Sequence, residues 1–353
     1  MRRTAASRLP ADEEGADVRG HCLWSLLDNY ECAAGFSSRY GIVFIAEGGT
    51  GSGHSVSVAR GRSIEGPFEG APDDPVLSAS GRHLPVQCTG HADLVPGPHG
   101  TDVLVLLGTR QAGAAFPLGR ETYVTAVEWA DGWPQPAPVD LQPRPEPVDE
   151  HFGFTDDRAL TDPGWLAVGR TPGDVASSGA RPGHLTIRAT SGGIDAFRPD
   201  FIGRRQRHLK SLFETTIDPA DGTGGRGLRF SEDFTIALIA ERTPSGTGTR
   251  VTARPCLPTL TQKSAAELAG GPVLLRLETD TPPPATTPWS PNGDLIRLTA
   301  VDVTGTETRL AEFDGRFWSV ETAAPFTGRV VGMFAEHGTV HFSDFRYHGK
   351  GLS

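Results

Sequence analysis

Apolar and polar positions alternate with a period of two along much of this chain. Residues 55–59 (SVSVA) and 185–188 (LTIR) show the alternation clearly. Successive side chains of a β-strand point to opposite faces of a sheet, so this pattern predicts half-buried strands. Similar short runs predict strands at residues 42–46, 104–107, 122–127, 234–239, 273–277, 295–298, 328–334 and 340–347. Helical periodicity is scarce, and residues 264–269 (SAAELA) favour a helical turn or two.

Turn residues separate these short strands, since 44 of the 353 residues are glycine and 29 are proline. Many short strands with turns between them indicate an all-β protein, built as propeller blades or as a sandwich. A proline-rich stretch, residues 134–147, cannot pair inside a sheet because proline lacks the backbone N–H. We therefore expect one β domain over residues 28–150 and a second over residues 151–353, whose size suits a two-sheet sandwich.

The first 27 residues are polar and lack periodicity, so residues 1–27 are expected to be a disordered or non-native leader. Their basic start leads into Pro10 and an acidic run, so a secretory signal is not predicted. No apolar run approaches the ~20 residues that a membrane-spanning helix needs. We predict a cytoplasmic protein without a membrane partner, unless the true start of the chain is missing.

Charge and cysteine content exclude some classes of partner. A net charge of −10 disfavours nucleic acid and is compatible with a neutral sugar. The four cysteines show neither a CxxC pair nor zinc-like spacing with histidine. They are Cys22, Cys32, Cys88 and Cys256. We expect buried or idle thiols; a Cys22–Cys32 disulfide is the alternative, which a cytoplasmic location disfavours.

Short motifs in a fixed order carry the functional signal. They are IAEGGT (residues 45–50), TGHADLV (89–95), LGRET (118–122) and DGWP (131–134). Together they resemble the late blades of the catalytic domain in glycoside hydrolase family 43, the β-xylosidase and α-L-arabinofuranosidase group. Residues 201–208 and 326–333 resemble the opening and the end of the β-sandwich that follows this domain in β-xylosidases.

The resemblance implies a partial five-bladed β-propeller, with about the last two blades recognisable, followed by a concanavalin A-like β-sandwich (jelly roll). It implies hydrolysis of O-glycosyl bonds in xylo-oligosaccharides or arabinosyl side chains with inversion. Inverting enzymes hold a general acid and a general base roughly 6.5–9.5 Å apart, with a water molecule between them. The family's base aspartate has no counterpart in residues 1–27, which indicates a truncated or degenerate start. A noncatalytic carbohydrate-binding or remnant protein is therefore the alternative, and an oligomer is compatible with either function.

Glu31 is the candidate general acid by position, because the family's acid lies just before the strand that precedes IAEGGT. The residues after it, from Cys32 to Gly35, depart from the family's Gly-Pro-His. A general acid must have its pKa raised by burial or by neighbouring negative charge. The alternative is an exposed loop glutamate.

His91 resembles the histidine at the propeller centre, which contacts a calcium ion or its water shell. Calcium prefers oxygen ligands, so we expect contact through water. The alternative is a histidine satisfied by backbone hydrogen bonds inside a blade. Asp93 is expected to be structural.

The predicted substrate-binding residues are Arg120, Phe326 and His54. Arg120 resembles an arginine that binds sugar hydroxyls or a catalytic carboxylate, for which planar guanidinium donors are suited; the alternative is an ion pair with Glu121. Phe326 resembles a residue on a sandwich loop that reaches toward the sugar site in related xylosidases. Its ring could stack on a sugar C–H face, and the alternative is a core phenylalanine. For His54 the alternative is an ordinary turn histidine.

Two further groups of residues have structural interpretations. Trp129 and Trp133 are expected to pack within a blade, and Glu47 to be part of a blade without a catalytic role. The basic run at residues 204–208 (RRQRH) could indicate nucleic acid. Within an acidic protein we expect it instead on a sandwich strand, making ion pairs.

Overall fold

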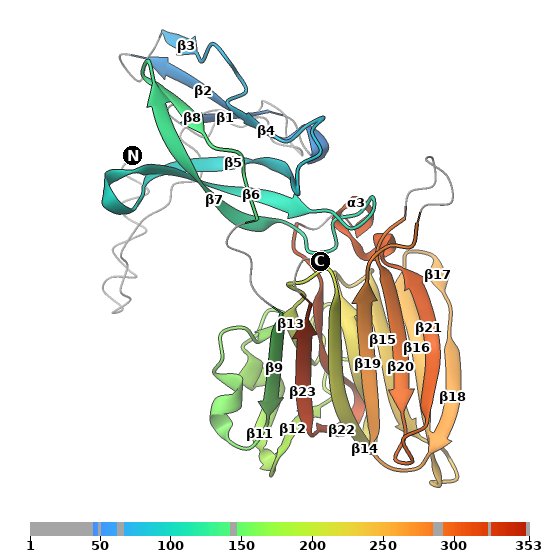
Figure 1. Cartoon of the computed structure of the whole chain (residues 1–353). Helices are drawn as coiled ribbons and strands as arrows, with labels where there is room; N and C mark the ends of the chain where they lie inside the picture. The colour runs from blue at the N-terminus through green and yellow to red at the C-terminus, as the bar shows by residue number, and fades with distance from the viewer. Residues whose placement is uncertain are drawn as a thin grey trace. The chain divides into compact units, whose positions relative to one another are not determined.

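The computed structural model describes residues 45–48, 51–61, 67–141, 147–284, 292–323 and 326–350. Within these residues the protein is all-β, which confirms the predicted fold class (Figure 1). Its helices are short: η1 (Gly51–Gly53), η2 (Pro98–Gly100), η3 (Asp157–Leu160), α2 (Pro172–Val175), η4 (Gly315–Trp318) and α3 (Val320–Ala323). In this part of the chain no helix is long and apolar enough to cross a membrane. The predicted leader, Cys22, Cys32 and Glu31 lie outside the described residues.

The chain folds into two compact units. The first contains the described residues up to His83, together with Cys88–Leu107 and Tyr123–Val139. The second contains Leu84–Gln87, Gly108–Thr122 and the chain from Asp140 onward. The segment Gly108–Thr122, which carries the LGRET motif, therefore belongs to the same unit as the sandwich.

Two four-stranded sheets carry the early motifs, and four strands is the size of a propeller blade. One contains β1 (Ile45–Gly48), β2 (Ser55–Gly61) and β3 (Phe68–Gly70), with β4 (Leu77–Ser78) paired to β2. The other has the order β5-β6-β7-β8. Its strands are β5 (Val86–Pro96), β6 (Asp102–Arg110), β7 (Glu121–Ala130) and β8 (Trp133–Pro136).

The turn between β7 and β8 shows why the DGWP motif has this sequence. Asp131 and Gly132 have φ values of 51° and 75°. Positive φ at both central residues defines a type I′ turn, which Asp-Gly adopts readily and which matches the twist of the flanking strands. Antiparallel pairing of Ala130 with Trp133 then closes the hairpin, and β8 continues to Pro136. The prediction that the proline-rich stretch cannot pair in a sheet is therefore wrong at its start, because β8 lies at the edge of its sheet, where proline is tolerated.

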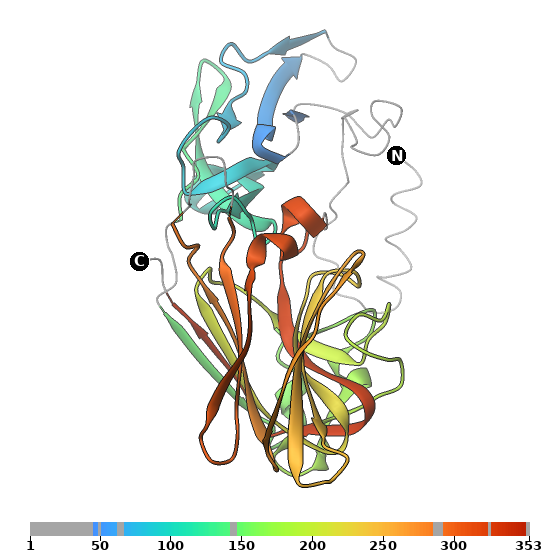
Figure 2. The same cartoon turned by 90° about the vertical axis from the view of Figure 1, so that its right-hand side faces the viewer.

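The second unit holds a two-layer sandwich (Figure 2). The strands of its first half are β9 (Val148–Gly153), β10 (Leu166–Ala167), β11 (Ala176–Arg181), β12 (His184–Arg188), β13 (Phe201–Arg205), β14 (Ser211–Arg229), β15 (Thr235–Arg242) and β16 (Gly248–Leu257). Those of its second half are β17 (Leu260–Thr261), β18 (Ser264–Ala269), β19 (Val273–Asp280), β20 (Leu295–Val301), β21 (Glu307–Asp314), β22 (Val330–Phe342) and β23 (Asp344–Gly349).

One long strand joins the two layers. The first part of β14 pairs with β19 and β23, and its last part, Gly224 to Arg229, pairs with β15. A register shift between Asp218 and Asp221 separates the two parts, and such irregularities let a strand bend from one sheet to the other. The core between the layers includes fully buried Phe213, Leu228 and Phe342.

The strand predictions for residues 55–59, 104–107, 122–127, 185–188, 273–277 and 295–298 are confirmed, because each range lies inside an observed strand. The predicted helical turn at residues 264–269 is wrong. These residues form β18, which pairs antiparallel with β16 from Ala253 to Gly248. A six-residue helix is unstable alone, so the partner strand's hydrogen bonds outweigh local helix propensity.

Cysteines in the described residues bear out the thiol prediction. Cys88 is buried and Cys256 is half-buried, and both are free. Burial raises the pKa of the Cys256 thiol, and the negative charge of Asp195 raises it further. A raised pKa leaves less of the reactive thiolate at neutral pH.

Candidate active site

Arg120 and Phe326, predicted from separate motifs, are in direct contact in the second unit. The Arg120 guanidinium lies over the Phe326 ring, 3.6 Å from its centroid. The Arg120 amide donates to the Phe326 carbonyl at 2.9 Å, and Gly119 forms a β-bridge with Thr327. Phe326 remains 55% exposed. The cationic guanidinium thus stacks on the face of a partly exposed apolar ring and forms a cation–π pair with it.

Glycine makes this approach of two backbones geometrically feasible. Gly119 has φ +70°, and a Cβ there would overlap the backbone of Thr327 and Gly328. A Cβ at Gly328 would overlap the Leu118 carbonyl. Both positions therefore require glycine for the Arg120 and Phe326 backbones to come within hydrogen-bonding distance.

Further bonds attach the segment Gly108–Thr122 to the sandwich. Arg110, only 3% exposed, donates to the Arg207 carbonyl at 2.7 Å and to both carboxylate oxygens of Glu121 at 2.8 Å. The Phe116 amide donates to Glu321 at 3.1 Å. Glu121, the alternative partner proposed for Arg120, thus has a bidentate bond to Arg110, which sequence reasoning missed.

His54 lies in the interior of the first unit, with 4% of its surface exposed. Its Nδ1 is 3.3 Å from the Cys88 carbonyl oxygen, and a Cβ at Gly90 would overlap its ring. Cys88 and His91 both have φ 52°, a left-handed conformation that non-glycine residues rarely adopt. The structure therefore brings His54 against the TGHADLV motif, where it supports an irregular backbone, whereas Arg120 belongs to the other unit.

His91 is half-buried in β5, and Asp93 is exposed. Within the described ranges no group of three histidine, cysteine, aspartate or glutamate side chains is placed to hold a metal ion. Calcium stays a prediction from the resemblance.

A general acid must keep its proton near neutral pH, so the direction of each carboxyl pKa shift decides whether the group suits this role. Burial raises the pKa of Asp200, but hydrogen bonds from Thr190, Arg170 and Ser191 outweigh it, and the net pKa is lowered. At Asp162 burial likewise opposes the bonds from Arg204 and Gly164, and the net pKa is again lowered. Every resolved shift of a carboxyl pKa in this part of the chain is downward, also at Asp174, Asp280 and Asp302. Such groups are ionised at neutral pH, so they are unsuited to donating a proton to a leaving group.

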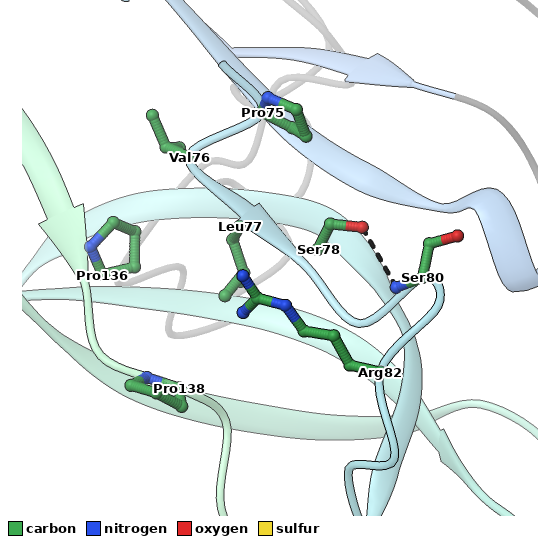
Figure 3. Close-up of a pocket in the computed structure, with 8 residues that line it drawn as sticks. All are labelled: Pro75, Val76, Leu77, Ser78, Ser80, Arg82, Pro136 and Pro138. Atoms are coloured by element: carbon green, nitrogen blue, oxygen red, sulfur yellow. Dashed lines mark hydrogen bonds between the residues drawn. The ribbon is translucent and has the colours of Figure 1, made fainter. Parts of the chain in front are cut away.

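A pocket of about 340 Å³ lies in the first unit (Figure 3). Its lining residues are Pro75, Val76, Leu77, Ser78, Ser80, Arg82, Pro136 and Pro138. None of the predicted site residues is among them. Three prolines line it beside polar residues, and the Ser80 amide donates to the Ser78 hydroxyl at 3.2 Å within it.

The basic run at residues 204–208 makes the ion pairs that its setting predicted. Arg204 lies 2.8 Å from Asp162, and Arg207 lies 2.7 Å from Glu150.

The tryptophan prediction is half right. Trp133 is buried under the Arg60 guanidinium, whereas Trp129, near the end of β7, is 51% exposed and donates to Asp102.

Four-stranded propeller-type sheets followed by a two-layer sandwich define an all-β protein with two kinds of β domain. Residues 38–134 match the model of "Glycosyl hydrolases family 43", and residues 154–348 match "Beta xylosidase C-terminal Concanavalin A-like domain". The second match covers more than half of the chain. The chain therefore belongs to glycosyl hydrolase family 43 and carries its β-xylosidase-type C-terminal domain.

Known proteins agree with this assignment. The "Non-reducing end alpha-L-arabinofuranosidase BoGH43B" of Bacteroides ovatus is 33% identical over 187 residues, which cover 47% of this chain and 34% of that protein. A crystal structure of a mutant of the family 43 protein BlXynB from Bacillus licheniformis matches with a TM-score of 0.71 and 22% identity, over 86% of this chain and 61% of that one. The aligned part of this chain spans about a third of the length of the curated family 43 relatives.

A different family matches the beginning of the chain. Residues 5–55 match the model of "Glycosyl hydrolase family 1", and the "Beta-glucosidase 6" of Oryza sativa is 64% identical over 33 residues, 9% of this chain and 6% of that protein. Sequence reasoning missed this match, although the departure of Cys32 to Gly35 from the family 43 pattern was an available signal. Glu31 lies inside the family 1 match and before the family 43 match begins, which weakens the positional argument for it as an acid.

Proposed function

We propose that this chain acts as a glycoside hydrolase on xylo-oligosaccharides or arabinosyl side chains, through the inverting acid–base mechanism. The stacking of Arg120 on Phe326 is the observation that carries the proposal. A pentose presents hydroxyl groups around its rim and apolar C–H faces, and the pair offers one surface for each. The names of the relatives, a xylosidase/arabinosidase and an α-L-arabinofuranosidase, support the substrate class.

In this proposal Arg120 donates hydrogen bonds to sugar hydroxyls, and the exposed part of the Phe326 ring covers a C–H face and excludes water. Glu31 is the proposed general acid. The inverting mechanism also needs a second carboxylate, which activates water on the opposite face of the sugar ring.

The test is hydrolysis of 4-nitrophenyl β-D-xylopyranoside and α-L-arabinofuranoside by the purified chain. Phe326→Ala and Arg120→Lys should each lower kcat/KM by about tenfold to a hundredfold, because stacking and planar hydrogen bonding are lost. Phe197→Ala is the matched control, since Phe197 is a 74% exposed phenylalanine in the same unit. Equal effects of Phe197→Ala and Phe326→Ala would count against the proposed role of the Arg120–Phe326 pair.

Glu31 is tested through the leaving group. Nitrophenolate leaves without a proton, whereas the sugar alcohol released from xylobiose needs one. Glu31→Gln should therefore slow xylobiose hydrolysis at least about tenfold more than 4-nitrophenyl xyloside hydrolysis. Equal rates for wild type and variant on both substrates would remove Glu31 from the mechanism.

A noncatalytic sugar-binding protein is the second candidate. The start of the family 43 match at residue 38 favours it, because the proposed acid Glu31 then lies outside that match. Binding of xylobiose without hydrolysis, with affinity lost in Phe326→Ala, would select this second function over the first.

A further inference from the structure

Arg329 is fully buried and lies three residues after Phe326, immediately before β22. Its Nη1 and Nη2 donate to the two carboxylate oxygens of Asp294, at 2.5 and 2.9 Å. Asp294 is also fully buried and lies immediately before β20. A bidentate bond between two charged groups fixes their relative orientation as well as their distance.

The same guanidinium holds a third segment, the η4 turn. Its Nε donates to the Trp318 carbonyl at 2.7 Å, and Nη2 donates to the Gly315 carbonyl at 2.6 Å. The Gly315 amide donates to the Asp294 carbonyl at 2.7 Å. A Cβ at Gly315 would overlap the Asp294 carboxylate, so a side chain at this position would disturb the pair. Three segments distant in sequence thus share one buried ion pair.

Backbone contacts attach the segment Gly108–Thr122 to the rest of the second unit at two points. Each point lies two residues before one member of the Asp294–Arg329 ion pair. The Ala114 amide donates to the Asn292 carbonyl at 2.8 Å, two residues before Asp294. Gly119 bridges Thr327, two residues before Arg329, and the Arg329 amide itself donates to the Pro117 carbonyl at 3.3 Å. The ion pair between Asp294 and Arg329 therefore keeps a constant distance between these two backbone contacts.

We propose that Asp294 and Arg329 are positioning residues for the sugar-contacting pair Arg120 and Phe326. They act through the backbone, by fixing both attachments of the segment that carries Arg120 relative to the segment that carries Phe326. The substrate part of this inference rests on the proposed function. Displacing groups that contact the sugar weakens binding of the ground state and of the transition state alike, so a rigid anchor for the pair keeps KM low.

Amide hydrogen exchange tests the anchor without relying on activity. Arg329→Met should accelerate exchange at Arg120, whose amide donates to the Phe326 carbonyl, by at least about tenfold, since local opening exposes that amide. Exchange in the β15 strand should stay unchanged. Arg170→Met is the matched control, because Arg170 makes a 3.0 Å ion pair with the buried Asp200 in the same unit. Unchanged exchange at Arg120 in the Arg329 variant would overturn the inference.

Steady-state kinetics test the link to the substrate. Arg329→Met should raise KM for 4-nitrophenyl xyloside about tenfold with kcat within about twofold, the pattern expected when binding contacts are displaced. Arg170→Met should leave KM unchanged, although it also removes an ion pair. Faster exchange with unchanged KM in an active enzyme would also overturn the inference.

A buried charge left without its partner can prevent folding. If Arg329→Met does not fold, the double variant Asp294→Leu/Arg329→Met removes both charges and replaces the single variant in both measurements, with the same expected results. If exchange accelerates at Arg120 but the wild-type chain neither binds nor hydrolyses xylosides, the anchor is supported and the proposed function fails. Failure of the proposed anchor and failure of the proposed function therefore give different experimental results.

Discussion

At the scale of residues, Arg226 is an unusual feature of the sandwich. It is fully buried in β14, with its guanidinium 4.9 Å from the Phe345 ring. Within the described residues none of its three guanidinium nitrogens has a hydrogen-bond partner. Burial lowers the pKa of Arg226 to about 9, although the negative charges of Glu214 and Asp344 oppose the shift. A buried charge without hydrogen bonds destabilises the folded state.

Arg226→Met should therefore raise the free energy of unfolding by about 1–4 kcal/mol, because methionine fills the site without a charge. Urea denaturation near pH 7 measures the change. Arg250→Met is the control, since Arg250 is exposed and its 3.9 Å ion pair with Glu267 should contribute little. A lower midpoint for Arg226→Met would mean that the guanidinium has a stabilising partner.

The pH dependence of this difference has a definite sign. The folded chain releases the Arg226 proton near pH 9, whereas the unfolded chain holds it to a higher pH. Above pH 9 the unfolded state therefore binds more protons, and this group makes wild-type stability rise with pH. The advantage of Arg226→Met is complete below pH 9 and should shrink by about 1.4 kcal/mol per pH unit above it. Denaturation of both proteins at about pH 7 and pH 10 checks this, and the same advantage at both values would contradict it.

At the scale of elements, the β7–β8 hairpin depends on a single glycine. Gly132 has φ +75°, and a Cβ there would lie 2.9 Å from Nη1 of Arg60. The same Arg60 atom donates to the Asp131 carbonyl at 2.9 Å. The turn thus combines a left-handed backbone with a close side chain, and both exclude a larger residue.

Gly132→Ala should lower the stability of the first unit by about 1–2 kcal/mol, the cost of a left-handed conformation for a residue with a Cβ. Gly53→Ala is the matched control in the same unit, because it has open space and no positive φ. Thermal unfolding followed by tryptophan fluorescence compares the two variants. Equal midpoints would show that the turn relaxes without cost.

At the scale of the whole molecule, the second unit contains more buried apolar side chains than the first among the described residues. The second unit contains a continuous cluster of fully buried side chains between two layers, among them Phe213, Phe342 and Phe345. Apolar burial contributes about 25 cal/mol per Å², so the larger core should give the more stable unit.

Calorimetry should therefore resolve two unfolding transitions, the lower one from the first unit. Gly132→Ala should shift only the lower transition, and Arg226→Met only the upper one. A single transition that moves with both variants would show that the units unfold together.

Part of the fold and of the site could be predicted from particular residues. The alternation at residues 55–59 and 273–277 was sufficient to predict strands, and the LGRET and TGHADLV motifs indicated the family. The strand at residues 264–269 could not be predicted, because its apolar content suits a helix and only pairing with β16 decides otherwise. The family 1 match at residues 5–55 could not be predicted, because residues 1–27 are polar and lack the periodicity that indicates a fold.

The amino-acid sequence was sufficient to predict the all-β class and the free thiols among the described residues, because periodicity and composition are local properties. Arg120 and Phe326 became candidates through short motifs that resemble family 43. Only the tertiary structure decided that Arg120 stacks on Phe326, that Glu121 binds Arg110 and that Asp294 and Arg329 form a buried pair beneath them. Contacts between residues far apart in the chain arise from packing, which no local pattern encodes.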